Sequence, residues 1–307
     1  MGGLLSWVQD EAEMAMDEES ALPRRERWLV VAVVLLAGLI LYAAARGQAE
    51  HWPLLGNISV RVYGYTLTLG LASWIALSLE RVEERRWWGW LAGVAATLAL
   101  LASWAAWSVR GAPDLVPQPV LAPYALSAAW GLFVALPFAQ AQLRGKRLGS
   151  AYSVLFEAAW QNGLSLLLAA FFVGICWLVL MLWQALFGLI GIQVFKRWFG
   201  EQAFAYLATA LMAGLGILIG RTQQAAVRMV RQIVFAICKG LLPLLAFVAV
   251  LFVLSLPFTG LDGLWRTRMA ARILLGLQLL MVLLVNAVHQ GEAAARPYPR
   301  ALDGLVR

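Results

Sequence analysis

Eight long runs of apolar residues, separated by short polar segments, constrain this chain more than any other feature. The runs cover about 28–45, 62–79, 87–109, 120–141, 163–191, 203–219, 233–256 and 270–288. A helix needs about 20 residues to cross a hydrocarbon core about 30 Å thick. Hydrophobic residues form 62% of the chain, against about 45–50% in soluble domains, so no soluble core would hide them all. The sequence therefore predicts an all-α, polytopic transmembrane helical bundle of about eight spans.

The polar segments predict five parts of the chain. These are an acidic segment at 1–27, transmembrane helices one to four at 28–141, a basic loop and amphipathic lead-in at 142–162, transmembrane helices five to eight at 163–288, and a polar tail at 289–307. The acidic segment has no Lys or Arg before Arg24, so it does not resemble a secretory signal. It is expected to form either a short amphipathic helix or an acidic tail.

The basic residues between the runs predict the orientation. Lys and Arg are enriched in the cytoplasmic segments of membrane proteins. Counted in alternate segments, fifteen of these bases fall in the set that includes both termini, among them the predicted loop bases Arg221, Arg228 and Arg231, and seven fall in the other set, among them Arg61. Both termini are therefore predicted to be cytoplasmic.

A polar stripe before the fifth run is the candidate functional site. Its members follow one another at four-residue spacing, with one amide beside them: Ser153, Glu157, Gln161, Ser165 and the neighbouring Asn162. A carboxylate near the start of an apolar run is costly to bury and normally faces a cavity or a partner. The stripe is interpreted either as an amphipathic lead-in along the cytoplasmic interface or as the wall of a polar cavity.

Two further segments carry structural predictions. Run six contains small residues at helical spacing that allow close helix packing, namely Ala210, Gly214, Gly216 and Gly220. The segment before it alternates aromatic and basic residues and is predicted to lie flat at the periplasmic interface. It consists of Phe195, Lys196, Arg197, Trp198 and Phe199.

The chain lacks the motifs of several chemical classes. It contains no phosphate-binding glycine loop, no His-Glu-x-x-His and no Gly-x-Ser-x-Gly. Its two cysteines, Cys176 and Cys238, have no metal-ligand spacing, and the bases do not form the basic face of a nucleic-acid-binding domain. We therefore predict no catalytic residues, no metal, no cofactor and no nucleic-acid partner.

Several short motifs in the second half resemble a known family. They are Leu-Phe-Glu-Ala-Ala-Trp-Gln-Asn at 155–162, Leu-Phe-Gly-Leu-Ile-Gly-Ile at 186–192, Leu-Pro-Phe-Thr-Gly-Leu at 256–261 and Pro-Tyr-Pro-Arg at 297–300. As a set they are similar to a bacterial inner-membrane family of unknown function, catalogued as domain of unknown function 4153. The resemblance covers about residues 23–300 and implies a multi-pass inner-membrane protein. It implies no activity, and it leaves open whether the chain is a short member or the first part of a longer protein.

Three functions are weighed on these observations. The favoured hypothesis is an accessory or structural membrane protein that binds membrane lipids, other membrane proteins or a second copy of itself. The alternative is a secondary transporter or channel with Glu157 in a polar cavity. A membrane-embedded enzyme acting on lipid-linked substrates is the least supported, because no acid–base pair or nucleophile is present.

Overall fold

The computed structural model describes residues 22–55, 57–109, 118–145, 152–191, 193–259 and 269–289. These residues form helices joined by short turns, and no strand occurs among them, so the predicted all-α class is confirmed. The acidic N-terminal segment and the tail after His289 lie outside the described residues.

Most of the described helices match the predicted runs. They are α2 (Arg24–Ala49), α3 (Ile58–Ser78), α4 (Arg85–Ser108), α5 (Gln118–Leu143), α6 (Tyr152–Leu189), α7 (Val194–Gly200), α8 (Gln202–Thr222), α9 (Gln224–Thr259) and α11 (Ala270–His289). Of these, seven are long and apolar enough to cross a membrane. The protein is therefore a multi-pass membrane protein. The remaining predicted run corresponds to α3, which has 21 residues but is less apolar because it carries Arg61 and several tyrosine, threonine and serine residues.

Two helices are longer than the hydropathy predicts. Helix α6 begins at Tyr152 and not at the expected 163, so the lead-in and the fifth run form one helix of 38 residues, about 57 Å long. Helix α9 begins at Gln224 and not at 233, so Arg228 and Arg231 lie on its first turns and not in a loop. Hydropathy marks the part of a helix that suits lipid, whereas the backbone hydrogen bonds continue through the polar turns before it.

The described helices belong to two compact units. The bundle unit comprises the chain up to Leu148 and Asn162–Gln224, and the C-terminal unit comprises Gly149–Gln161 and the chain from Ala225. Helix α6 therefore contributes its first turns to the C-terminal unit and the remainder to the bundle unit.

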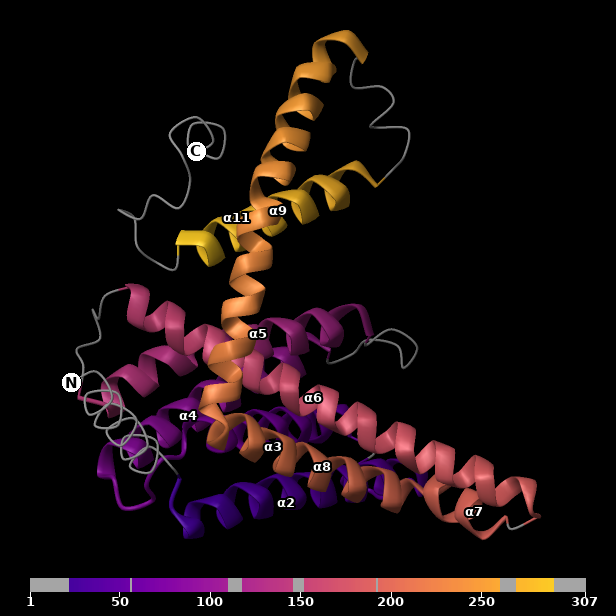
Figure 1. The fold of residues 1–307 in the computed structure, drawn as a ribbon. Helices are drawn as coiled ribbons and strands as arrows, with labels where there is room; N and C mark the ends of the chain where they lie inside the picture. Colours follow the sequence, from indigo (N-terminus) through magenta and orange to yellow (C-terminus); the bar gives the residue numbers. More distant parts are fainter. Residues whose placement is uncertain are drawn as a thin grey trace, which may run out of the picture. The chain divides into compact units, whose positions relative to one another are not determined.

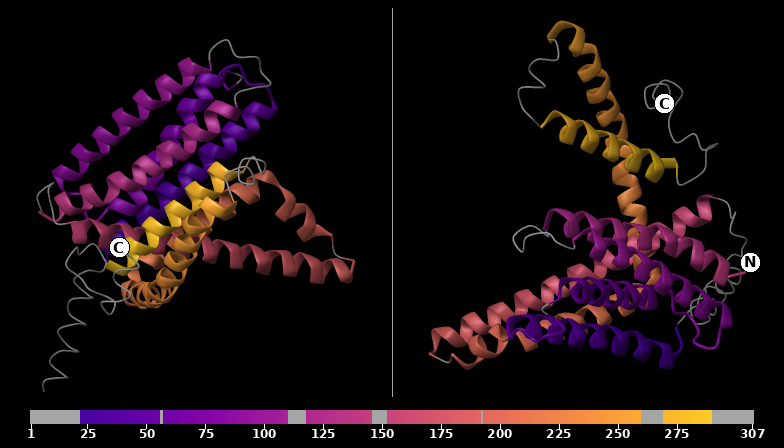
Figure 2. Two further views of the ribbon diagram at one scale, coloured as in Figure 1. Left: turned by 90° about the horizontal axis from the view of Figure 1, so that it is seen from above. Right: turned by 180° about the vertical axis from the view of Figure 1, so that it is seen from behind.

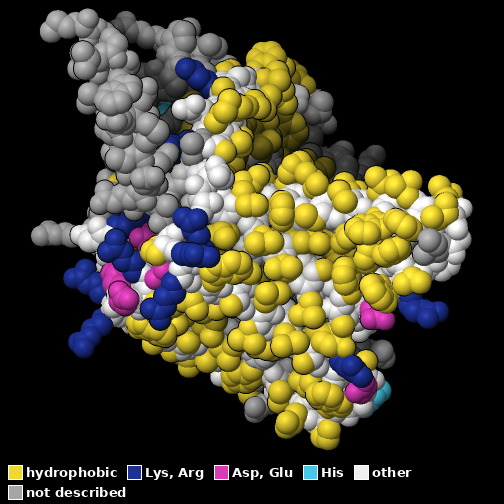
Figure 3. Space-filling view, turned by 60° about the horizontal axis from the view of Figure 1, so that its bottom comes forward, with side chains coloured by type: hydrophobic (Ala, Val, Ile, Leu, Met, Phe, Trp, Pro, Cys, Tyr) yellow, Lys and Arg dark blue, Asp and Glu magenta, His cyan; other side chains and the backbone are white. Residues whose placement is uncertain are grey.

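In the bundle unit, α3 packs against α2, α4 and α5, and α2 packs against α8. Figures 1 and 2 show α2, α3, α4 and α8 lying side by side. The core between α3, α4 and α5 is built around Trp74, Leu98 and Leu136, each 2% exposed. On the face drawn in Figure 3, hydrophobic side chains cover the middle of the surface and charged side chains gather toward its edges. This distribution suits helices whose ends lie among headgroups and whose middle faces lipid.

Helix α8 approaches its neighbours through its small residues. The buried residues of α8 are Ala210, Gly214, Gly216 and Gly220, the four predicted to pack. The first two face α2, where a Cβ on Gly38 would lie 2.4 Å from the Cβ of Ala210 and one on Gly214 would lie 3.4 Å from the Cα of Val31. The other two face α6. There a Cβ on Gly216 would lie 2.9 Å from the Cα of Ala169, so a larger side chain would collide with backbone.

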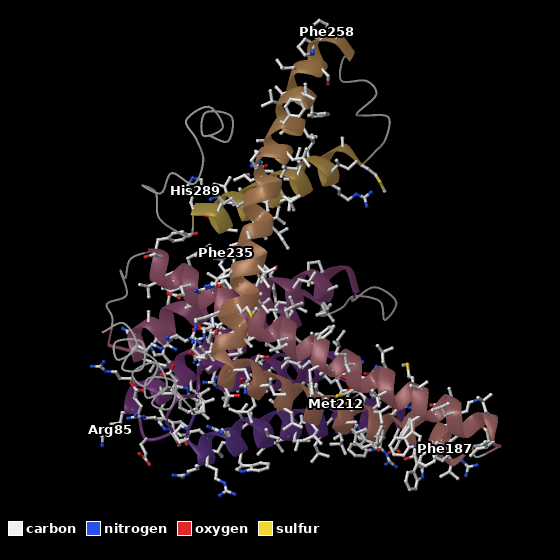
Figure 4. All side chains as sticks on the ribbon, in the orientation of Figure 1. Arg85, Phe187, Met212, Phe235, Phe258 and His289 are labelled. Carbon is white, nitrogen blue, oxygen red and sulfur yellow. The ribbon has the colours of Figure 1, made fainter. Side chains whose placement is uncertain are left out.

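In the C-terminal unit, α9 and α11 share a core around Leu242, which is fully buried, and Ala287. The first turns of α6 add Phe156 and Trp160 to this unit. Both rings contact Phe235 of α9, with the Trp160 and Phe235 centroids 5.0 Å apart. Figure 4 labels Phe235 on α9 and His289 at the end of α11.

Candidate functional site

A cluster of buried polar groups caps the C-terminal end of α3. The last carbonyls of a helix have no partner within the helix and need one from elsewhere. Arg221, near the end of α8, donates from Nη1 to the Ala76 carbonyl at 2.7 Å and from Nη2 to the Leu79 carbonyl at 2.6 Å. Gln140 of α5 donates from Nε2 to the Leu77 carbonyl at 3.1 Å. A cation at this end also opposes the partial negative charge of the helix dipole.

A reciprocal amide pair holds Gln140 in this position. Gln140 Nε2 donates to Asn162 Oδ1 at 3.2 Å, and Asn162 Nδ2 donates to Gln140 Oε1 at 2.9 Å. Both side chains are buried. We name Arg221, Gln140, Asn162 and the three carbonyls the α3 end cluster. Because its donors and acceptors are matched, its role is to join α3, α5, α6 and α8.

Further polar contacts surround the α3 end cluster. The indole Nε1 of Trp87 donates to the Ser78 hydroxyl at 3.1 Å in a buried position. Glu80 accepts from Arg144 at 2.9 Å in an ion pair whose partners are 40% and 56% exposed. An exposed pair of this kind contributes little to stability. The buried hydrogen bonds therefore determine the packing at this end.

The predicted polar stripe does not act as one surface. Four-residue steps exceed the 3.6-residue turn, so Ser165 lies about 120° around α6 from Ser153. Ser165 is buried in the bundle unit and donates to the Gly220 carbonyl at 3.2 Å, and Asn162 belongs to the α3 end cluster. Ser153, Glu157 and Gln161 belong to the C-terminal unit and are not buried.

Glu157 has a basic partner in the C-terminal unit. Its carboxylate accepts from Arg231 Nη1 at 2.9 Å, and the two side chains are 61% and 21% exposed. Arg231 is a base on α9 that the sequence placed in a loop. The carboxylate is therefore paired and largely exposed. A role in coupling ions to transport stays a prediction.

The segment predicted to be interfacial forms the short helix α7. Its bases and Trp198 are exposed, while its two phenylalanines are half-buried. Phe195 lies 5.3 Å from Trp183 and 4.7 Å from Phe187 between ring centroids, and Phe199 stacks on Phe204 at 5.1 Å. Figure 4 shows Phe187 and Arg85 at opposite ends of the bundle unit. The position of α7 at a membrane interface stays a prediction.

A long groove runs between α4 and α5 in the bundle unit. We name it the α4–α5 groove; its volume is about 1200 Å³ and most of its lining is apolar. It extends from Arg86 and Gln142 at one end of the two helices to Ser108 and Val120 at the other. Helix α4 spans about 36 Å over its 24 residues, close to the thickness of a hydrocarbon core.

Three glycines widen the α4–α5 groove. Gly89 and Gly93 of α4 and Gly131 of α5 line it, and a Cβ on any of them would meet no atom within 4 Å. These glycines are therefore not needed for close helix contact, unlike those of α8. They leave space along the two helices that an extended apolar ligand can fill.

Polar donors lie at one end of the α4–α5 groove. Arg86 is exposed there, and Trp90 Nε1 donates to Gln142 Oε1 at 2.8 Å. That bond uses the acceptor of Gln142 and leaves its amide nitrogen as the remaining hydrogen-bonding atom. A cation and an amide donor at the mouth of an apolar groove favour a ligand whose headgroup is anionic.

Sequence reasoning missed most of these residues. Arg221 was counted as a loop base, but it lies in α8, is partly buried, and donates hydrogen bonds to the end of α3. Gln140 lies at the end of an apolar run and carries no motif. The signal for the groove was present as Gly89 and Gly93, four residues apart on run three, but spacing alone does not separate a contact glycine from one that lines a groove.

The described residues contain no group of three or more His, Cys, Asp or Glu side chains able to hold a metal ion. Comparison of the chain with protein-family models, with curated proteins and with solved structures finds no match. The functional assignment therefore depends on the groove and on the polar groups of the bundle unit.

Proposed function

We propose that this protein is an accessory membrane protein that binds an anionic membrane lipid in the α4–α5 groove. The observation that carries the proposal is the groove itself. It is apolar along nearly the whole length of α4, and its polar end holds Arg86 and Gln142. An acyl chain fits the apolar part, and a phosphate accepts hydrogen bonds from the guanidinium.

A lipid explains the groove better than a small polar substrate. Polar ligand sites present several convergent polar groups in a pocket of about 300–1,000 Å³. The α4–α5 groove is longer, and its cation and its amide side chain, Arg86 and Gln142, lie at one end. Since both helices are long and apolar enough to cross a membrane, the groove would be filled from the lipid phase.

Native mass spectrometry of the full chain in a mild non-ionic detergent tests the proposal. Phosphatidylglycerol is the probe, and phosphatidylcholine with the same acyl chains is the neutral comparison. Gly93→Leu places a side chain in the groove at a position where a Cβ meets no atom within 4 Å, and we expect it to lower phosphatidylglycerol binding at least tenfold. Gly174→Leu is the matched control, because Gly174 is exposed on α6 and its Cβ also meets no atom within 4 Å.

Equal lipid binding by Gly93→Leu, Gly174→Leu and the unmodified chain would contradict the proposal. Loss of dimer with no change in lipid binding would instead assign the groove to a second copy of the chain. Arg86→Gln separates headgroup from chain recognition, since it should reduce the preference for phosphatidylglycerol over phosphatidylcholine.

We further propose that the protein lies in a bacterial inner membrane with both termini on the cytoplasmic side. The excess of bases in alternate segments supports the orientation, and the resemblance to domain of unknown function 4153 supports the membrane. Cysteines introduced at Ser6 and Asp114, with Cys176 and Cys238 replaced by alanine, test the orientation. Labelling of position 6 from the periplasm would contradict it.

A further inference from the structure

A second cavity of the bundle unit lies between α3 and α5. We name it the inner pocket; its volume is about 620 Å³, within the range of small-molecule sites. Helix α3 supplies one wall with residues that recur one turn apart, among them Arg61, Tyr65, Leu69 and Ser73. Arg61, Tyr65 and Ser73 are polar, and they lower the hydropathy of α3 below that of the other long helices.

Two buried donors that belong to the lining of the inner pocket have no protein acceptor. Among the described residues, three buried side-chain atoms lack a hydrogen-bond partner: Glu26 Oε2, Arg61 Nε and Trp74 Nε1. Glu26 lies in the first turn of α2, where the helix dipole favours a carboxylate. The other two line the inner pocket. Trp74 is only 2% exposed, so solvent does not compensate its N–H.

The charge of the lining defines the chemistry of a ligand. Among the described residues, Arg61 is the only charged residue that lines the inner pocket, and no carboxylate lines it. The Thr66 and Tyr124 hydroxyls bond each other at 3.0 Å. A buried donor without an acceptor is unfavourable. The pocket therefore offers a guanidinium with one unmatched donor near one end of α3 and an unmatched indole N–H deeper inside.

An arginine near a helix end often extends to the headgroups, and this is the simplest alternative for Arg61. Arg61 is half-buried, and of its guanidinium nitrogens Nε is the one that is buried without a partner. Trp74 supplies the independent observation, since its indole cannot reach the headgroups from a position 2% exposed.

We propose that the inner pocket binds an acidic amphiphile, with its acid group at Arg61, its hydrocarbon chain along α3 and α5, and an oxygen acceptor at Trp74. Arg61 and Trp74 are thirteen steps apart on α3, which corresponds to about 20 Å along the helix axis and about 140° around it, so a chain that meets both crosses the pocket wall at an angle. An extended chain advances about 1.2 Å per bond, so about sixteen bonds span this distance. The α3 wall, with Arg61 and Trp74, separates this site from the α4–α5 groove, although four residues line both cavities: Leu98, Tyr124, Ala128 and Leu132.

Three sixteen-carbon probes test the proposal by native mass spectrometry of the full chain. They are hexadecanoate, 16-hydroxyhexadecanoate and hexadecanol, and phosphatidylglycerol is added as a separate arm. We expect 16-hydroxyhexadecanoate to bind best and hexadecanol to bind at least tenfold more weakly than the acids. Phosphatidylglycerol binding that depends on Arg61 would identify a phospholipid as the source of the acid group.

Single substitutions test whether Arg61 and Trp74 make the proposed contacts with the ligand. Arg61→Gln should weaken binding of the two acids about ten- to a hundredfold, the value of a charged hydrogen bond. Trp74→Phe should abolish the preference for the hydroxylated acid and leave hexadecanoate binding nearly unchanged. Arg46→Gln is the matched control, because Arg46 lies at the same end of the bundle unit and pairs with the exposed Glu50 at 2.8 Å.

One filling variant and its matched control keep the test valid if Arg61→Gln fails to fold. Ala125→Phe narrows the inner pocket and should block the acids, whereas Ala96→Phe alters an exposed residue that lines neither cavity. Gly93→Leu should leave these acids bound, which separates this site from the proposed groove. Equal binding of hexadecanoate and hexadecanol, or Arg61→Gln and Ala125→Phe proteins that bind like the unmodified chain, would overturn the proposal.

Discussion

Buried polar groups have hydrogen-bond partners at the C-terminal end of α3 but lack them on the face of the same helix that lines the inner pocket. At the end, the last carbonyls accept from Arg221 and Gln140, and the amide of Gln140 is paired in turn. On the pocket face, Arg61 Nε and Trp74 Nε1 have no acceptor among the described residues. A matched polar cluster stabilises one packing arrangement. Unmatched donors stabilise the protein only when a ligand supplies acceptors. The matched end of α3 therefore has a structural role, and the unmatched pocket face is suited to binding.

Arg221→Leu should have the largest effect on the stability of the bundle unit. It leaves the carbonyls of Ala76 and Leu79 without their buried donors, and we expect a loss of about 2–4 kcal/mol in the free energy of unfolding. Arg221→Lys keeps the charge but cannot reach both carbonyls from two nitrogens, so its loss should be smaller. Denaturation in mixed micelles measures both. Equal stability of Arg221→Leu and the unmodified chain would show that the cluster is not structural.

Gly216→Leu should cause the second largest loss of stability, because it shifts α8, which positions Arg221 against the end of α3. A Cβ added at this position would lie 2.9 Å from the Cα of Ala169, and moving the backbone of α6 to relieve that contact costs free energy. Overpacking of this kind costs about 1–3 kcal/mol. Gly174→Leu on α6 is the control with no expected loss. An unchanged melting temperature for Gly216→Leu would contradict the close packing of α6 and α8.

Asn162→Leu should cost about 1–2 kcal/mol, since it leaves the Gln140 carbonyl oxygen without its donor. A double-mutant cycle with Gln140→Met measures the coupling between the two amides. We expect a coupling energy of about 1 kcal/mol. Additive effects within experimental error would mean that the pair does not act as a unit.

The sequence predicts where the helices of this fold begin and end far better than it predicts which contacts their polar residues make. The runs at 87–109 and 270–288 match α4 and α11 within two residues, because hydropathy and length are local properties. Arg61 and Arg221 were both counted as loop bases, yet one lines a pocket and the other bonds the end of α3. Their roles depend on which neighbouring helix they face, and a single sequence does not encode that contact locally.

Trp74→Phe should have the smallest effect on the ligand-free protein when it is compared with Trp87→Phe. Both substitutions replace a buried indole by a smaller ring and leave a cavity. Trp87→Phe also loses the hydrogen bond to Ser78, whereas Trp74→Phe removes a buried N–H that has no acceptor among the described residues, so its loss of stability should be smaller. A loss of stability in ligand-free Trp74→Phe as large as in Trp87→Phe would indicate that the Trp74 indole already has a structural partner.

A cryo-electron-microscopy map of the full chain with 16-hydroxyhexadecanoate shows whether the unmatched donors of α3 meet a ligand. We predict elongated density along α3, with ligand oxygens about 3 Å from the Arg61 guanidinium and from Trp74 Nε1. A map in which both nitrogens bond protein groups, with the space between α3 and α5 closed by side chains, would contradict it.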